Sequence, residues 1–476
     1  MFVRAPWLAL MLVGVSAACG GQPPAAEDAP SVVLITIDTL RADRMSLYGH
    51  TRPTTPQIDE FASGGVVFDA AASAGPCTVP AHASMLTGRY PGFHSAGSSN
   101  GGYKVLADEV TLAEVFADRG YFTAAVVSNP VLNHRLGLAQ GFAIYDDELP
   151  EQELNRDNNE RLADQAVDRA LEVLAEAGDR PYFLWLHLQD PHGPYTPPAG
   201  WRSEWRVEVP GPQLTELADQ SGDGGLPSYQ VLGDQRDAEY YALQYDREIA
   251  YADHHLGRFL DALEQDGVFD EGLVILTSDH GEAIGEDDYW FAHCVSVSSD
   301  QIHVPLVMRG RGVDSGARVA SPVSNVAIFR TFLDFVGADQ IPSTPVPIAG
   351  SRLERFVPEP LSMNPDGAVY AESLNQIGVI GGGALLRWDR YPPDNEFWSA
   401  GNPNTHGPWR PLGTSLEGFA GQGVDDTDVA HAALAPLLRS YEAEVVRTER
   451  ALADSRQTTR LPKGVEDALR AIGYIQ

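Results

Sequence analysis

Residues 32–38 read Val-Val-Leu-Ile-Thr-Ile-Asp, a run of aliphatic and β-branched residues that ends in a carboxylate. Three further apolar runs each end in polar residues: residues 121–127 before Ser128 and Asn129, residues 182–188 before Gln189 and Asp190, and residues 273–276 before Thr277, Ser278 and Asp279. Continuous apolar runs are typical of strands that are buried on both faces, as in parallel sheets. These runs therefore predict a mainly parallel sheet.

Amphipathic patterns separate the apolar runs. Thr111 and Glu114 form a capping box at the start of residues 112–119, which predicts the start of a helix there. Residues 162–177 and residues 240–263 are longer amphipathic stretches. Because strands and helices alternate along the chain, the sequence predicts an α/β sandwich.

Carboxylates follow three of the predicted strands, at Asp38, Asp190 and Asp279. Ligands bind α/β sheets beyond the carboxyl ends of the strands, so these side chains mark the expected site. Asp38, Asp279 and the adjacent His280 are predicted to hold one divalent cation, and such a ligand set suits manganese, zinc, calcium or magnesium. Taken alone, an Asp-His pair is more typical of a turn with a helix cap than of a metal site.

Residues 74–91 read Ala-Gly-Pro-Cys-Thr-Val-Pro-Ala-His-Ala-Ser-Met-Leu-Thr-Gly-Arg-Tyr-Pro. Proline is favoured in the first turn of a helix, so a helix is predicted from Pro80 to Thr87, with Thr78 at its N-terminal end. Orphan amides and the helix dipole stabilise an anion there. Metal coordination would make the Thr78 hydroxyl a nucleophile, so Thr78 is predicted as both catalytic residue and metal ligand. The alternative is an ordinary threonine N-cap.

The chain of 476 residues can bury one large core or two unequal ones, and we expect two, since single cores stop growing at about 250–300 residues. We predict a larger domain over residues 31–337 and a smaller C-terminal α+β subdomain over residues 338–476. Residues 201–237, rich in glycine, proline, serine and aspartate, are predicted to form an insertion or lid loop. Within the subdomain we predict a linker, two strands and a final helix: residues 342–347, 369–372, 384–388 and 465–472.

The N-terminal segment predicts export. Residues 1–18 have a basic start at Arg4 followed by an apolar run, which is typical of a secretory signal peptide. Cys19 after Ser-Ala-Ala resembles a lipoprotein cleavage site, and residues 19–30 form a tether rich in glycine, proline and alanine. We therefore expect a bacterial cell-envelope protein, periplasmic or anchored to the outer membrane through lipidated Cys19; ordinary secretion is the alternative.

The formal net charge is −33, with 66 acidic and 33 basic residues. This charge argues against nucleic acid and against anionic membrane surfaces as partners. We therefore expect a small-molecule or envelope-glycan or lipid substrate, and membrane contact only through a lipid on Cys19. Because a bound metal ion makes a site locally positive, an anionic ester remains an acceptable substrate.

Three segments of the sequence, residues 35–43, 74–91 and 276–282, together resemble the sulfatase branch of the alkaline phosphatase superfamily. The resemblance implies an alkaline-phosphatase-like α/β/α sandwich and a sulfatase-like catalytic domain over residues 31–337. It also implies a metal-dependent ester hydrolase with one divalent cation bound to the four residues predicted above, namely Asp38, Thr78, Asp279 and His280.

The reactive position departs from the sulfatase pattern. Sulfatases carry Cys or Ser, one residue, Pro, one residue and Arg, and the Cys or Ser is oxidised to formylglycine. Here Pro80 fixes the register, so Thr78 stands at the reactive position and His82 stands where the arginine is expected. Cys77 lies one residue too early, and threonine cannot be converted to the aldehyde.

Superfamily branches with an unmodified threonine, such as phosphodiesterases, lipoteichoic acid synthase and phosphoethanolamine transferases, handle phosphoryl groups. The resemblance therefore implies hydrolysis of phosphate mono- or diesters through a covalent phospho-threonine at Thr78. Three alternatives stay open: a sulfuric ester hydrolase that works without formylglycine, a phosphoryl-group transferase of the cell envelope, and a catalytically inactive envelope binding protein.

Two histidines match the family pattern outside the metal set. His192 stands in an Asp-Pro-His stretch, and His293 stands eleven residues before a Val-Pro-Leu strand that starts at Val304. The resemblance implies that His192 donates a hydrogen bond or proton to the leaving group and that His293 stabilises the transferring or leaving group. The alternatives are a loop histidine before proline and a surface histidine in an acidic loop.

The chain has three cysteines, too few for a disulfide framework. If Cys19 carries a lipid, Cys77 and Cys294 remain, and they adjoin Thr78 and His293. We hypothesise that they form a disulfide bond that braces the site in an oxidising compartment. The alternative is two small buried apolar side chains.

Overall fold

The computed structural model describes residues 29–94, 96, 104–105, 107, 109–338, 368–373, 376–389, 414–424 and 426–456. The predicted signal peptide, Cys19, the linker at 342–347 and the helix at 465–472 lie outside these residues. Within the described part of the chain, no helix combines the length and the apolar character that a membrane span requires.

An eight-stranded sheet forms the centre of the larger domain, in the strand order β11-β2-β10-β9-β1-β8-β4-β5. Its strands are β1 Val32–Ile37, β2 Val66–Phe68, β4 Phe122–Val126, β5 Ile144–Asp146, β8 Tyr182–Leu188, β9 Leu273–Ser278, β10 Leu306–Gly310 and β11 Ala317–Val319. Strands β9, β1, β8, β4 and β5 are parallel, and β10 runs antiparallel to both of its neighbours. The predicted mainly parallel sheet is confirmed.

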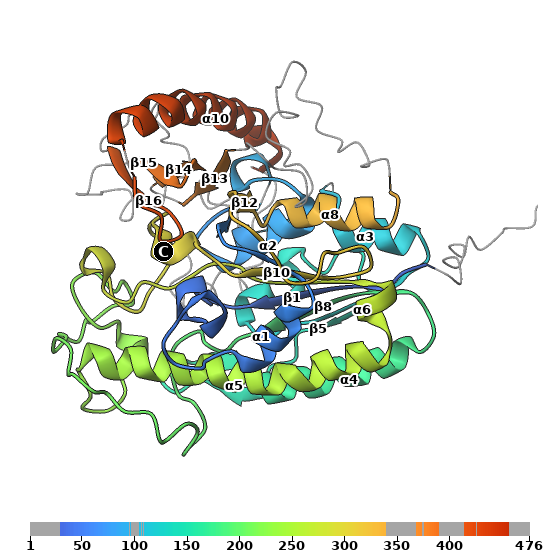
Figure 1. Cartoon of the computed structure of the whole chain (residues 1–476), viewed down its shortest axis with the longest axis horizontal. Helices are drawn as coiled ribbons and strands as arrows, with labels where there is room; N and C mark the ends of the chain where they lie inside the picture. Colours follow the sequence, from blue (N-terminus) through green and yellow to red (C-terminus); the bar gives the residue numbers. More distant parts are fainter. Residues whose placement is uncertain are drawn as a thin grey trace, which may run out of the picture.

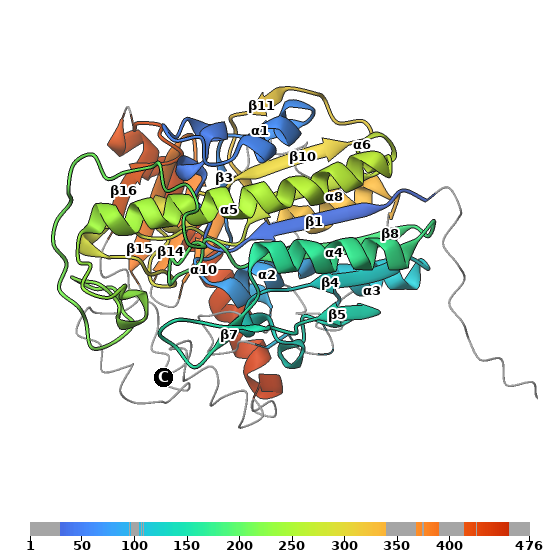
Figure 2. The ribbon, with the colours of Figure 1, turned by 90° about the horizontal axis from the view of Figure 1, so that it is seen from below.

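Helices cover both faces of this sheet (Figure 1). One layer contains α1 Pro56–Ser63, α4 Ala163–Ala177, α5 Ala238–Gln265 and α6 Val268–Glu271, and the other contains α2 Thr78–Thr87, α3 Leu112–Asp118 and α8 Ala327–Phe335. Figure 2 shows α4 and α5 lying across their face of the sheet. Alternate residues of β1 serve the two layers: Val33 and Ile35 belong to the core under α4 and α5, whereas Val32 and Leu34 belong to the core under α2, α3 and α8.

A smaller antiparallel sheet packs beside α2 and carries a long helix on its outer side (Figure 1). Its elements are β13 Val369–Glu372, β14 Gln376–Gly381, β15 Ala384–Asp389, β16 Thr414–Gly418 and α10 Thr427–Arg456. The backbone amide of Glu372 donates to the carbonyl oxygen of Ala74 (2.9 Å), which ties this sheet to the segment before α2. The α/β/α sandwich with a smaller C-terminal α+β part is therefore confirmed.

The remaining regular elements are short. They are β3 Ala71–Ala72 paired with β12 Val323–Ser324, β6 Glu151–Gln152 paired with β7 Asn159–Glu160, and the single-turn helix α7 Ser299–Ile302. Residues 201–237 are largely irregular, as predicted, with one 3-10 turn at Ser228–Gln230.

Most predicted boundaries agree with the structure to within two residues. The bounds of β1, β8 and β13 match the predictions, and α3 carries the capping box of Thr111 and Glu114. Strand β9 extends two residues beyond the prediction, because Thr277 and Ser278 continue the pairing with β1. Helix α2 begins at Thr78 rather than at Pro80, and Cys77 occupies the N-cap position. The alternative that Thr78 is itself the N-cap is therefore wrong.

Candidate active site

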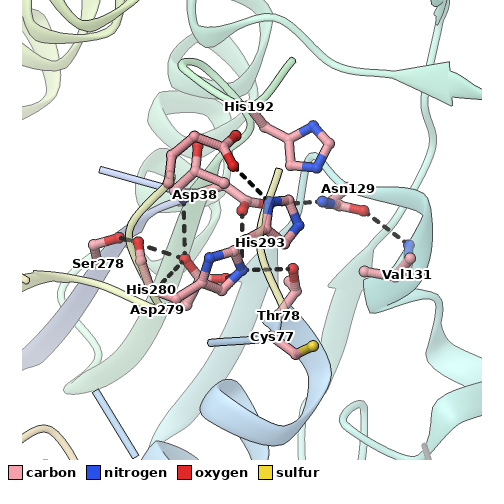
Figure 3. Close-up of polar contacts among 12 residues, drawn as sticks. Asp38, Cys77, Thr78, Asn129, Val131, His192, Ser278, Asp279, His280 and His293 are labelled. Carbon is pink, nitrogen blue, oxygen red and sulfur yellow. Dashed lines mark hydrogen bonds and ion pairs between the residues drawn. The ribbon is translucent and has the colours of Figure 1, made fainter. Parts of the chain in front are cut away.

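The predicted metal ligands converge at the carboxyl ends of β1 and β9 (Figure 3). These strands are parallel neighbours, so Asp38 and Asp279, which follow them, lie at the same edge of the sheet. Helix α2 presents Thr78 from its first turn, and the Thr78 Oγ1 lies 3.2 Å from Nε2 of His280. The same Nε2 lies 3.8 Å from Asp38 Oδ1 and 3.4 Å from Asp279 Oδ2. All four side chains are buried.

Each aspartate uses one oxygen for hydrogen bonds and leaves the other free. Asp38 Oδ2 accepts from the side-chain amide of Asn129 (2.6 Å), and Asp279 Oδ1 accepts from the backbone amides of His280 (2.9 Å) and Thr39 (3.3 Å). Asp38 Oδ1 and Asp279 Oδ2 find no hydrogen-bond partner within the part of the chain that the structure describes. A buried oxygen without a partner is costly, so these two oxygens fit ligation of a cation.

His280 has the tautomer that metal ligation requires. Its Nδ1 lies 2.9 Å from the carbonyl oxygen of Gly281, which only accepts, so Nδ1 carries the proton. Nε2 therefore presents a lone pair toward the two free carboxylate oxygens. Burial raises the pKa of Asp38 although His280 and other neighbours oppose the shift, and a cation would keep this carboxylate ionised. Two carboxylates, one imidazole and one hydroxyl thus fit a divalent cation.

A second buried group, consisting of His82, His187 and Asp279, also has metal-like spacing. His82 is occupied otherwise, because its Nδ1 donates to the carbonyl oxygen of Thr78 (2.8 Å) and its Nε2 lies 3.1 Å from the hydroxyl of Thr36. Burial lowers the pKa of His82 to about 3, so the ring is neutral and holds the backbone of Thr78. The hydrogen bonds of His82 therefore favour Asp38, Asp279 and His280 as the candidate cation ligands and give His82 a supporting place.

His187 and Asn129 approach Asp38 from the side away from the free oxygen. His187 Nε2 lies 3.5 Å from Asp38 Oδ2, and burial lowers the pKa of His187 to about 4. Sequence reasoning did not assign His82, His187 or Asn129 to the site. The available signals were the position of His82 one helical turn after Thr78, and the positions of His187 and Asn129 at the ends of predicted strands.

The structure brings His192 and His293 to the same cluster (Figure 3). The His293 ring centroid lies 4.5 Å from that of His280 and 5.2 Å from that of His192. Burial strongly lowers the pKa of His192, and the neighbouring His293 lowers it further. Burial also opposes a charge on His293, but the Glu282 carboxylate, together with Asp38 and Asp279, raises its pKa above the ordinary value. Their catalytic roles remain predictions.

Cys77 and Cys294 form a disulfide bond, with Cα atoms 4.7 Å apart. The backbone amide of Cys294 also donates to the carbonyl oxygen of Pro76 (2.9 Å). The hypothesis of a disulfide at the site is therefore confirmed. It joins the residue before Thr78 to the residue after His293, and so fixes two predicted catalytic residues relative to each other.

The fold and this site together define a metal-dependent hydrolase of the alkaline phosphatase superfamily. The Sulfatase family model matches residues 30–338, and the chain belongs to this family. Human iduronate 2-sulfatase is 26% identical over 421 residues, which cover 72% of this chain and 75% of that protein. The predicted family and enzyme class are confirmed.

Solved structures share the fold. A phosphonate monoester hydrolase from Silicibacter pomeroyi has a TM-score of 0.63 and 20% identity, and the match covers 89% of this chain and 96% of that one. A protein in complex with its substrate D-glucosamine-2-N,6-O-disulfate has a TM-score of 0.61 and 17% identity, with 89% and 98% of the two chains covered. At these identities the structural likeness supports the fold and leaves the substrate open.

Proposed function

We propose that the chain hydrolyses phosphate mono- or diesters through a covalent phospho-threonine at Thr78. The observation that carries this proposal is the place of the Thr78 hydroxyl, an unmodified nucleophile 3.2 Å from the free ring nitrogen of His280. A chain with threonine at this position has no residue from which formylglycine forms. The neutral His82 in the place of the sulfatase arginine also supports a departure from that chemistry.

In the proposed first step, Thr78 Oγ1, whose proton has already passed to solvent, forms a bond to phosphorus as the bond from phosphorus to the leaving oxygen breaks. A divalent cation, if bound by Asp38, Asp279 and His280, would supply Lewis-acid stabilisation of the charge that develops. The N-terminal amides of α2 lie at the same position and favour an anionic phosphoryl group. His293 or His192 gives a proton to the leaving oxygen.

In the second step, water attacks phosphorus and the bond to Thr78 Oγ1 breaks, which releases phosphate or a phosphate monoester. The histidine that gave its proton takes one from the attacking water, so the protein returns to its starting state. An acceptor alcohol in place of water would make the reaction a transfer.

The decisive experiment compares Thr78→Ala with Thr78→Ser on an aryl phosphate, an aryl phosphodiester and an aryl sulfate. We expect Thr78→Ala to lower kcat/KM on the phosphate substrates by at least about 10³-fold, as removal of a covalent nucleophile does, and Thr78→Ser to keep measurable activity. Unchanged activity of Thr78→Ala would exclude the proposal. Products measured with and without an added alcohol separate hydrolysis from transfer.

Sulfate ester hydrolysis without formylglycine is the second candidate, favoured by the named activity of the human relative. Glycan sulfates are included as candidate substrates because a structural neighbour was solved with a sulfated glucosamine as its substrate. Under this candidate, the purified chain cleaves the aryl sulfate with a higher kcat/KM than either phosphate ester. The same three substrates therefore decide between the two functions.

We propose that the protein works in the bacterial cell envelope. The basic and apolar pattern of residues 1–18 and the position of Cys19 support this location. A disulfide at the site also suits an oxidising compartment. A Cys19→Ser variant should move from the membrane fraction to the soluble fraction of the producing cells; equal fractionation of variant and wild type would contradict lipid anchoring.

A further inference from the structure

Glu282 is a fully buried carboxylate beside the proposed reaction centre. Its Oε1 lies 3.1 Å from Nδ1 of His293, and its Oε2 accepts a hydrogen bond from the hydroxyl of Tyr195 (3.0 Å). The backbone carbonyl of the same residue accepts from the guanidinium of Arg41 (2.9 Å). Both carboxylate oxygens and the backbone are therefore fixed, so Glu282 presents Oε1 to His293 in one orientation.

The backbone and ring of His293 are held from several sides. The hydroxyl of Tyr289 donates to the carbonyl oxygen of His293 (3.1 Å), and the next residue forms the disulfide described above. The ring contacts His280 and His192, and Figure 3 shows it among the residues of the cation site. Once the backbone is fixed, the hydrogen bond to Glu282 decides which ring nitrogen of His293 is occupied by a protein partner.

A carboxylate oxygen accepts hydrogen bonds, so Nδ1 of His293 is the donor in the 3.1 Å contact with Glu282 Oε1 and carries a proton there. The second ring nitrogen, Nε2, is then the atom available for proton exchange with a substrate. A carboxylate that orients an imidazole in this way keeps the ring in one productive tautomer, as a third group does in hydrolases with a catalytic triad.

We propose that Glu282 is a positioning residue that holds His293 with Nε2 toward the leaving oxygen, and that His293 rather than His192 exchanges the proton there. This inference rests on the proposed hydrolysis of phosphate esters. As the bond to the leaving oxygen breaks, the proton on Nε2 passes to that oxygen while Nδ1 keeps its own. In the second step, Nε2 takes a proton from the attacking water.

The competing explanation is that Glu282 only fills its buried position and supports the loop through Tyr195 and Arg41. The leaving group separates the two. A good leaving group such as 4-nitrophenol departs without a proton, whereas phenol needs one, so loss of oriented proton transfer slows phenyl phosphate more. A structural defect slows both esters alike.

The test measures kcat and KM of Glu282→Leu and Glu282→Gln on both esters. We expect Glu282→Leu to lower kcat on phenyl phosphate by about 10²-fold or more, a usual contribution of a positioned acid-base group, with a smaller loss on 4-nitrophenyl phosphate. Glu282→Gln keeps an acceptor for Nδ1 and should recover most of the loss. Equal losses on the two esters, or no recovery with Gln, would overturn the inference.

A matched control is Asp253→Asn, which changes a buried carboxylate on α5 that binds the backbone amides of Gln57 and Ile58. We expect this variant to keep the wild-type ratio of the two rates. If Asp253→Asn changes the ratio of the rates on the two esters as much as Glu282→Leu does, the ratio does not report on Glu282 and the inference is wrong.

A measurement without turnover covers the case in which Glu282→Leu folds poorly or the wild type does not cleave these esters. In protein with 15N-labelled histidine, the ring signals of His293, assigned with His293→Asn, should show a protonated, hydrogen-bonded Nδ1 in the wild type and in Glu282→Gln. A proton on Nε2 alone in the wild type would refute the inference. Inactivity of the wild type on phosphate esters would instead count against the proposed function.

Discussion

Thr78 is set apart from an ordinary helix-capping threonine by where its hydroxyl points. It occupies the first position of α2, after the N-cap Cys77, and its hydroxyl turns toward His280 instead of toward its own helix amides. The backbone of Thr78 is held separately by His82. Because the backbone and the hydroxyl have different partners, a change of partner at the hydroxyl leaves the contact that holds the backbone in place.

Metal content provides the first test at the residue scale. The hydrogen bonds of His82 leave one cation site, so we expect one equivalent of divalent metal per chain by elemental analysis of purified protein. Asp279→Asn should lose that metal, because it removes an anionic ligand, and His82→Gln should keep it. Two equivalents in the wild type, with one lost in His82→Gln, would contradict the assignment.

Glu160 on β7 predicts how stability depends on pH. Burial, reinforced by the carboxylates of Glu153 and Asp190, raises the pKa of Glu160 from 4.5 to about 8. Its contribution to stability is therefore complete below pH 4.5 and is lost as the pH rises through 8, since the unfolded chain releases the proton earlier. Each pKa unit corresponds to about 1.4 kcal/mol, so the effect amounts to a few kcal/mol at most.

We therefore expect Glu160→Gln to lose less stability than the wild type when the pH is raised from 5 to 9, on the two sides of the pKa of about 8. Urea unfolding at both pH values measures the difference. A variant and wild type that lose the same free energy of unfolding over this interval would show that the carboxyl of Glu160 is not held protonated in the folded state.

Some residues of the candidate site could be predicted from local sequence patterns, and others could not. Asp38, Thr78, Asp279 and His280 stand in motifs, and the sequence predicted them. Glu282 also lies in the segment 276–282, but its contact with His293, 11 positions away, is set by the fold, as is the contact of Asn129 with Asp38 across 91 positions. Such contacts depend on tertiary structure, which no local spacing encodes.

At the scale of elements, the disulfide is the main link between the two halves of the proposed site. It connects the N-cap of α2 to the loop that carries His293, across 217 positions of the chain. Strand pairing places Asp38 and Asp279, whereas the His293 loop is held by side-chain and loop contacts. These include the disulfide, the hydrogen bond from the Cys294 amide to Pro76 and the contact of His293 with Glu282.

Removal of the disulfide should affect both stability and turnover. We expect the Cys77→Ala, Cys294→Ala double variant to lose about 2–4 kcal/mol of unfolding free energy, the usual contribution of a native disulfide. We also expect kcat to fall by a larger factor than KM rises. Thermal unfolding and steady-state kinetics measure the two effects. Thiol counting on denatured, unreduced wild type must find neither Cys77 nor Cys294 free; two reactive thiols would refute the bond.

Elements with a continuous local pattern were predictable, and interrupted ones were not. Strands β1 and β8 are unbroken apolar runs, and their predicted bounds match the structure. Helix α10 was missed, and it carries Pro436 in its interior, a residue that normally marks a helix boundary. The antiparallel direction of β10 was also not predicted, because an apolar run is the same in either direction.

For the whole molecule, the net charge of −33 sets a condition on stability. Like charges on one folded chain repel each other, and the repulsion is relieved by salt. We expect the melting temperature to rise when sodium chloride is raised from about 10 mM to about 150 mM, which shortens the Debye length from about 30 Å to about 8 Å. Calorimetry measures this, and a lower melting temperature in the higher salt would contradict it.

The hydrophobic cores show how the large and small sheets are joined. The cores on the two faces of the large sheet lie within the residues that the Sulfatase model matches, whereas two further cores combine residues of the small sheet with residues of the larger part, and one of these also includes α10. The sequence predicted two units from length and from a weakening pattern. It did not predict that the small sheet contacts the segment before Thr78. That contact is the hydrogen bond from Glu372 to Ala74, which lie far apart in the sequence.

The central claim is that the unmodified hydroxyl of Thr78 forms a covalent bond to the substrate. The most direct measurement is the intact mass, with peptide mapping, of protein quenched during turnover of a slowly cleaved aryl phosphodiester. We predict an added phosphoryl ester on the peptide that contains Thr78, and no adduct in Thr78→Ala. An adduct on another residue, or an active wild type that carries none while turnover is limited by breakdown of the intermediate, would contradict the account.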